Sequence, residues 1–244
     1  VRRHIIDLLA EQVAFGADGA HIVFNRGYPL VLYEKPFCDM FIEKHGVDPN
    51  QFAEEDPRVI QMRSDIVSTF FKELRAELDK EEQRRADGRH IEISAMVLGN
   101  NENNLQYGVD VSRLVREKLL DVVYIYQFDF GATKGGGYDP EYFREACGSQ
   151  GVPHLPTVDP PYDLKGQLPQ ALQLYESGAP GITFWDAGGV DTYKWAIQSR
   201  LGHIDEVRWR HKNLDSEKPP RNFHFYKWWG AQRMDGRFPV YWGG

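Results

Sequence analysis

Two hydrophobic periods alternate along this chain. Short apolar runs broken by single polar residues, typical of strands, are separated by longer stretches in which apolar residues recur every three or four positions, typical of helices. The strand-like runs are expected at residues 20–24, 90–98, 121–128, 152–158 and 181–185. The helix-like stretches are expected at residues 1–15, 57–85, 111–118, 140–147, 168–177 and 192–201. This order predicts a parallel sheet whose strands are joined by right-handed helical crossovers.

The first and the longest of these helices carry the clearest patterns. The first presents one apolar face, made of Ile5, Ile6, Leu9 and Val13. The longest begins at Asp56-Pro57, a capping residue followed by a proline suited to a first helical turn. Its apolar stripe includes one charged residue, Arg63, and its charged stretch at residues 80–85 is expected to be a solvated helix end.

Every predicted strand ends at an amide or carboxylate side chain. The five residues are Asn25, Asn100, Asp129, Asp159 and Asp186. One such residue would mean little, because Asn and Asp are common turn formers. Their repetition favours a shared functional edge, since catalytic groups of an α/β barrel sit at the C-terminal ends of its strands.

Composition narrows the classes of function. The chain has 244 residues, 41% hydrophobic and 27% charged, which suits one large α/β domain or two small ones. Its net charge of -7, with dispersed basic residues, argues against a nucleic-acid partner. No run is long and apolar enough to span a membrane, so no membrane partner is expected. The first residues do not read as a signal peptide, and a secreted or periplasmic location would need a leader upstream.

The cysteines and histidines give no sign of a metal site. Cys38 and Cys147 are far apart and fit no ligand spacing, so two free thiols are expected and a disulfide is the alternative. The histidines show no close pairing. We therefore expect neither a metal nor another cofactor.

Several segments resemble a bacterial family of uncharacterised glycoside-hydrolase-like TIM barrels. They read ADGAHIVFNRG, VLYEKPFCDMF, KHGVDPNQFAEEDPRVIQMRSDIVSTFFKELRAELD, ENNLQYGVDVSRLVREKLLDVV and GITFWDAG. The resemblance implies a (β/α)8 barrel of which residues 1–203 form strands four to eight. Residues 204–244 would then be an aromatic-rich C-terminal extension packed on the barrel. A five-stranded arc leaves open edges, so either an upstream segment of a longer protein or a second chain is expected to complete the barrel.

The resemblance implies glycosidic-bond hydrolysis of an oligo- or polysaccharide by two carboxyl groups and no cofactor. Glu34, among aromatic residues, is the candidate acid, and Asp129 or Asp186 is its candidate partner. As an alternative, Glu34 is a loop acid paired with Lys35 or Arg26, and Asp186 is a turn or capping residue.

Further polar and aromatic residues near the strand ends are the candidate substrate-binding groups. They are Asn25, Arg26, Tyr33, Asn100, Glu102, Tyr126, Asp159 and Trp185. The competing function is a non-catalytic carbohydrate-binding barrel, and a structural or assembly protein is a third alternative. The sequence leaves open the sugar, the linkage, the stereochemical outcome and the oligomeric state.

Overall fold

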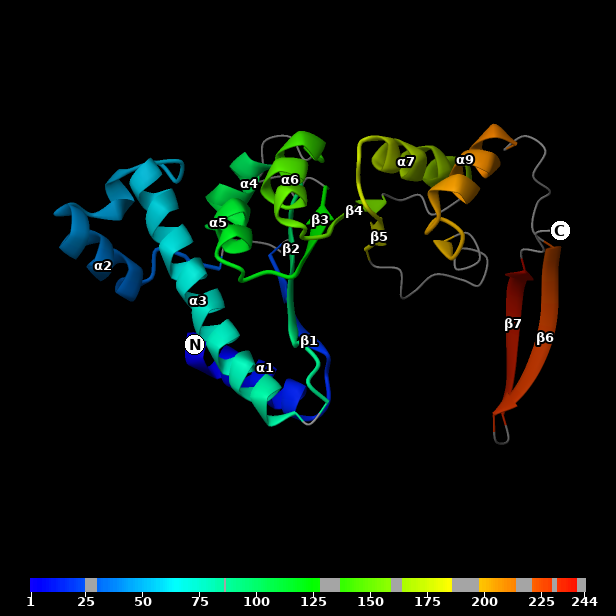
Figure 1. The fold of residues 1–244 in the computed structure, drawn as a ribbon, viewed down its shortest axis with the longest axis horizontal. Helices are drawn as coiled ribbons and strands as arrows, with labels where there is room; N and C mark the ends of the chain where they lie inside the picture. Colours follow the sequence, from blue (N-terminus) through cyan, green and yellow to red (C-terminus); the bar gives the residue numbers. More distant parts are fainter. Residues whose placement is uncertain are drawn as a thin grey trace. The chain divides into compact units, whose positions relative to one another are not determined.

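The computed structural model describes residues 1–24, 30–85, 87–127, 137–158, 164–185, 198–213, 221–229 and 232–240. Its contacts divide the chain into two compact units, residues 1–156 and 157–244, and each is described by itself (Figure 1). Five strands pair in parallel in chain order. They are β1 (Gly19–Val23), β2 (Glu92–Leu98), β3 (Val122–Tyr126), β4 (His154–Val158) and β5 (Thr183–Phe184). The predicted parallel α/β fold is thereby confirmed, and it is consistent with part of an α/β barrel.

The first unit contains more helices than the sequence pattern predicts. They are α1 (Arg2–Ala14), α2 (Lys35–His45), α3 (Pro57–Arg84), α4 (Asn101–Gln106), α5 (Val111–Arg116) and α6 (Pro140–Ala146), with 3-10 turns η1 (Pro49–Gln51) and η2 (Gly148–Gln150). Helices α2 and α4 lie in segments for which the sequence pattern predicts no helix. Helix α2 buries only Phe37 and Phe41, and α4 is six residues long, so neither gives a strong periodic signal.

In the residues of the second unit that the structure describes, there are two helices and an antiparallel hairpin. The helices are α7 (Leu164–Glu176) and α9 (Ile204–Lys212), and the hairpin strands are β6 (Arg221–Trp229) and β7 (Gln232–Val240). The hairpin pairs residues from Arg221↔Val240 to Trp229↔Gln232. Helix α9 lies in the segment expected to form an aromatic-rich C-terminal extension, where no helix was predicted. Its charged sequence has little apolar periodicity, so the hydrophobic pattern did not indicate a helix there.

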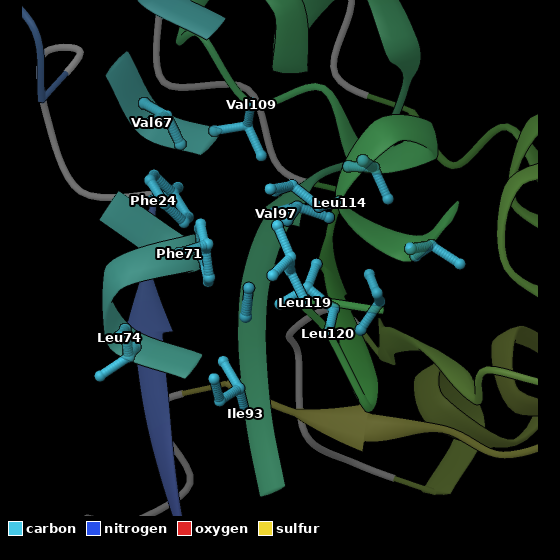
Figure 2. Packing of buried hydrophobic residues seen from close by; sticks show 14 of the residues in the cluster. Phe24, Val67, Phe71, Leu74, Ile93, Val97, Val109, Leu114, Leu119 and Leu120 are labelled. Atoms are coloured by element: carbon cyan, nitrogen blue, oxygen red, sulfur yellow. The ribbon is translucent and has the colours of Figure 1, made fainter. Parts of the chain in front are cut away.

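The core of the first unit lies between α3 and the sheet. Phe71, Leu74 and Leu78 of α3 are fully buried, as are Ile93 and Val97 of β2. The ring centroids of Phe24 and Phe71 are 6.0 Å apart (Figure 2). Burying one such side chain contributes roughly 1.5–3 kcal/mol, so this stripe is the main source of the unit's stability.

Helix α1 lies alongside α3 and is oriented by ion pairs (Figure 1). The Nε atom of Arg2 is 2.7 Å from a Glu73 carboxylate oxygen, and Arg3 is 3.3 Å from Glu77. This orientation buries Ile6 and Val13 but leaves Ile5 40% exposed, so Ile5 was wrongly assigned to the buried face. Among the described helices, none is long and apolar enough to cross a membrane.

The charged end of α3 is bonded to its neighbours, contrary to the expected solvated end. The Arg85 guanidinium donates to the Val13 carbonyl at 2.7 Å and also to the Ala17 carbonyl. Glu82 accepts a hydrogen bond from the Ile91 amide at 3.0 Å. These bonds fix the end of α3 to the turn before β1 and to the start of β2.

The two cysteines are free, and they differ in environment. Cys147 is fully buried, and this burial raises the pKa of its thiol to about 12. Cys38 is half-buried on α2. We predict that an aromatic disulfide reagent at pH 8 modifies Cys38 in the folded protein and reaches Cys147 only on unfolding, because the thiolate is the reactive form. The Cys38→Ser variant should lack the fast phase, and two equally fast thiols in the folded wild type would contradict the described core.

Candidate functional site

The C-terminal ends of β1, β2 and β3 meet at one edge of the sheet. Their register pairs Val23 with Met96 and Leu98 with Tyr126. We call this edge the rim. It includes the described segments that follow the three strands in the sequence, residues 30–34, 99–106 and 137–139. Parallel pairing brings these segments to the same edge although they are far apart in the sequence.

The structure describes some of the predicted site residues. Tyr33, Glu34, Asn100, Glu102 and Tyr126 belong to the first unit, and Trp185 belongs to the second. The other five lie outside the described residues: Asn25, Arg26, Asp129, Asp159 and Asp186.

Glu34 is the residue immediately before α2. Its backbone is extended, and its carbonyl accepts the Cys38 amide at 3.0 Å, which closes the first turn of the helix. Its side chain makes no capping hydrogen bond and the residue is exposed. The expected apolar enclosure of Glu34 is therefore absent from the described residues, because Phe37 turns into the α2–α3 contact instead.

Tyr33 connects this segment to α3. Its ring stands edge-on to Phe37 at 5.5 Å, and the Arg63 guanidinium lies 5.3 Å from the ring centre. The Tyr33 hydroxyl is buried without a hydrogen-bond partner among the described residues. Burial raises the pKa of this phenol, and the nearby positive charge of Arg63 opposes the rise.

Arg63 is the central charged residue here, and sequence reasoning did not propose it as a site residue. It is 1% exposed, donates to the Gln106 carbonyl at 3.2 Å and lies 3.6 Å from the Glu54 carboxylate. It thereby joins the segment after β1, the segment before α3 and the end of α4. One feature of the sequence could have indicated this role of Arg63, namely that it is a charged residue inside an apolar helical stripe. A charged residue is seldom buried without partners, so its position in the stripe predicts a buried polar contact.

Close backbone packing accompanies Arg63. Gly108 has φ +76°, and a Cβ there would press on the Arg63 backbone. Only glycine adopts this conformation without strain, so the turn after α4 can lie directly on α3. Arg63 is therefore in contact with the Gly108 turn as well as with the Tyr33 ring.

The asparagine-rich segment after β2 is a structural anchor. The Asn100 side chain accepts the Asn103 amide at 2.9 Å and caps α4. Asn104 is fully buried, donates to the Leu98 and Asn100 carbonyls and accepts the Leu98 amide, each at 2.8 Å. The Asn100 oxygen expected to contact substrate is therefore engaged in a helix cap, whereas Glu102 is exposed on the first turn.

The glycine-containing segment before α6 returns to the end of β2. The Asp139 amide donates to the Gly99 carbonyl at 2.9 Å, and a Cβ on Gly99 would overlap the Gly137 carbonyl. Tyr126, at the end of β3, is only 5% exposed. Its ring is therefore not an open surface for stacking on a sugar, contrary to expectation.

A polar cavity of about 370 Å³ lies away from the rim, between α5 and α6. Ser112, Arg116, Tyr142 and Glu145 are among its lining residues. Burial raises the pKa of Tyr142 to about 12, so its phenol stays protonated across the physiological range. None of the predicted site residues that the structure describes lines this cavity.

Comparison with known proteins adds no family. No family model and no curated protein sequence matches the chain. Any assignment of function therefore depends on the residues and on their geometry.

The buried position of Arg63 can be tested with Arg58, on the same helix, as the matched control. The Arg58 guanidinium also lies over an aromatic ring, 4.0 Å from the Phe52 centre, but its side chain is 41% exposed. We predict that Arg63→Gln lowers the free energy of unfolding by about 2–3 kcal/mol, because a buried network loses its centre. Arg58→Gln should change it little. Urea unfolding measures both, and equal effects would contradict a central role for Arg63.

The anchoring role of Asn104 can be tested in the same way. Asn104→Ala leaves the buried amide and carbonyl of Leu98 without their side-chain partner, which should cost about 3 kcal/mol of unfolding free energy. Asn101→Ala, on the exposed side of the same short helix, is the control and should be nearly neutral. Denaturant midpoints report the difference, and a stable Asn104→Ala protein would show that α4 is held by other contacts.

Proposed function

We propose that this protein is glycoside-hydrolase-like and cleaves a glycosidic bond in an oligo- or polysaccharide with a pair of carboxyl groups. The observation that carries the proposal is the parallel order of five strands, each followed in the sequence by an amide or carboxylate residue. In an α/β barrel such residues face a common active-site opening. The fold alone hosts many reactions, so it is the carboxylates that favour hydrolysis among them.

In this proposal Glu34 is the general acid. It is exposed at the rim, and its position is fixed by the first turn of α2 and by the neighbouring Tyr33–Arg63 contact. Asp129, which belongs to the same unit, is the proposed nucleophile or base, and Asp186 is the alternative. Glu34 would protonate the departing glycosidic oxygen while its partner attacks the anomeric carbon or activates water.

The proposed substrate contacts are polar and aromatic residues that follow the strands in the sequence. In the first unit they are Asn25, Arg26, Tyr33 and Glu102, and Asp159 and Trp185 are further candidates in the second. Carboxyl groups about 5 Å apart would give retention, and a separation of roughly 6.5–9.5 Å would give inversion.

The proposal includes completion of the barrel. Within the described residues β1 pairs only with β2, so its other edge has unpaired backbone groups. We infer that a further strand, from an upstream segment or from a second chain, pairs there and closes a (β/α)8 barrel.

A carbohydrate-binding protein without catalysis is the second candidate. The exposure of Glu34 favours it, because a general acid usually has an apolar enclosure. This candidate retains recognition of sugar hydroxyls at the rim and lacks a working acid.

Glu34→Gln separates the two candidates, with Glu43→Gln on α2 as the matched exposed control. We predict that Glu34→Gln lowers the release of reducing sugar from a panel of polysaccharides at least about 100-fold, since general acid catalysis contributes this much. Binding of the same glycan, measured by calorimetry, should persist, and Glu43→Gln should retain full turnover.

Asp129→Asn and Asp186→Asn identify the partner carboxylate. Loss of turnover in one of them, with binding retained, assigns the second role. Unchanged hydrolysis in Glu34→Gln would refute its role as the acid. Glycan binding without hydrolysis by the wild type would establish the binding protein instead.

A further inference from the structure

His90 lies between two carboxylates at the N-terminal end of β2, the edge opposite the rim. Its Nδ1 atom is 2.9 Å from Glu82 Oε2, and its Nε2 atom is 3.0 Å from Asp121 Oδ1. An ionised carboxylate can only accept hydrogen bonds. Both ring nitrogens must therefore donate, and only the imidazolium form of His90 has two N–H groups.

The two carboxylates are held in place without His90. Glu82 Oε2 accepts the Ile91 amide at 3.0 Å, and Asp121 Oδ2 accepts the Ile93 amide at 2.7 Å. Arg75 of α3 lies 3.6 Å from the Glu82 carboxylate and 3.7 Å from the Asp121 carboxylate. A neutral His90 would thus turn one nitrogen lone pair toward a fixed carboxylate oxygen, which is repulsive.

Other charged groups near this cluster are already paired. Arg75 also bonds Asp79 at 2.6 Å and the Ile91 carbonyl at 2.7 Å. Arg89, next to His90, bonds Asp87 at 2.8 Å and Asp18 at 3.0 Å. The two carboxylates at His90 therefore have the positive charges of Arg75 and of the protonated imidazole beside them.

We propose that His90 is a pH-dependent clamp, which in its imidazolium form adds a connection between the end of α3 and the start of β3 and on deprotonation loses it, while Arg75 still joins the two. The ring proton passes to solvent, and the hydrogen bond it made to Glu82 or Asp121 is lost. The Arg85 bonds to Val13 and Ala17 remain, so α3 stays attached to the turn before β1. Deprotonation therefore weakens only the contacts of His90 itself with Glu82 and Asp121, while the Arg75 contacts remain.

The direction of the pH effect depends on the environment of the ring. Burial and the positive charge of Arg75 lower the pKa of His90, but the hydrogen bonds to Asp121 and Glu82 and the charge of Asp121 outweigh them and raise the pKa above its ordinary 6.5. The stabilisation is therefore fully present below the unfolded pKa and is lost as pH rises through the folded pKa. His21 and His154 behave oppositely, because burial lowers the pKa of each.

The experiment compares the full-length wild type with His90→Gln by urea unfolding between pH 5.5 and 9. Subtracting the two curves cancels the opposing contribution of the other histidines. The free energy of unfolding of the wild type should exceed that of His90→Gln most at low pH. Above pH 6.5 this difference should decrease, by about tenfold in the unfolding equilibrium constant for each pH unit between the unfolded and the folded pKa of His90. Arg85→Gln is the control, and its loss of stability should not vary across this range.

Nuclear magnetic resonance titration of the wild-type imidazole gives the folded midpoint independently. If His90→Gln fails to fold, Asp121→Asn replaces it, and the clamp then requires a lower His90 midpoint in that variant than in wild type. Faster exchange of the Ile91 and Ile93 amides at alkaline pH in wild type is also expected. A folded midpoint at or below 6.5, or a stability difference that does not change with pH, would overturn the proposal.

Discussion

Burial of the α3 stripe against β1 and β2 is the contact on which the other features of the first unit depend. Phe71, Leu74 and Leu78 are inaccessible to water, and the helix that carries them also contacts α1, α2, α4 and the turn before β1. The polar contacts along α3 depend on this packing. Arg63 reaches Gln106, and His90 reaches Asp121, only when α3 is packed on the sheet, because these partners are far from them in the sequence.

The two ends of α3 are fixed by different chemistry. Near its start, Arg63 joins segments that contain Tyr33, Glu54 and Gln106 through a buried guanidinium that stays charged at any physiological pH. Near its last turns, Glu82 meets a histidine, whose charge depends on pH. The proposed sugar-cleaving edge is therefore supported by the permanent charge of Arg63, while the opposite edge combines the charges of Arg75 and Arg85 with one titratable group, His90.

The strands and their parallel order could be predicted from the sequence, because alternating apolar runs and a strong 3.6-residue period leave few arrangements. Helices α2, α4 and α9 were missed for physical reasons. Helix α4 depends on asparagine hydrogen bonds such as that between Asn104 and Leu98, which no hydrophobic pattern reveals. The His90 cluster was also invisible, since it exists only because the β2–β3 register brings Asp121 beside Ile93.

Among the site residues, Glu34 lies at the start of α2, a helix that the sequence pattern did not predict. Asn100 illustrates a general ambiguity, because a polar residue that ends a strand can either bind substrate or cap a helix. The three residues after Asn100 decide for the cap, since they form the first turn of α4 and present the Asn103 amide to its side chain. Tyr126 was judged by residue type alone, whereas the direction in which its ring is buried depends on neighbouring strands.

Helix α3 is much longer than the strands that it covers. Its 28 residues extend over about 42 Å, whereas the seven residues of β2 extend over about 23 Å. The surplus turns carry Val59 and Met62, which with Phe37 and Phe41 form a small apolar cluster of their own. Because this apolar cluster is separate from the core on the sheet, substitutions within it can change the segment between β1 and α3 while the sheet keeps its register.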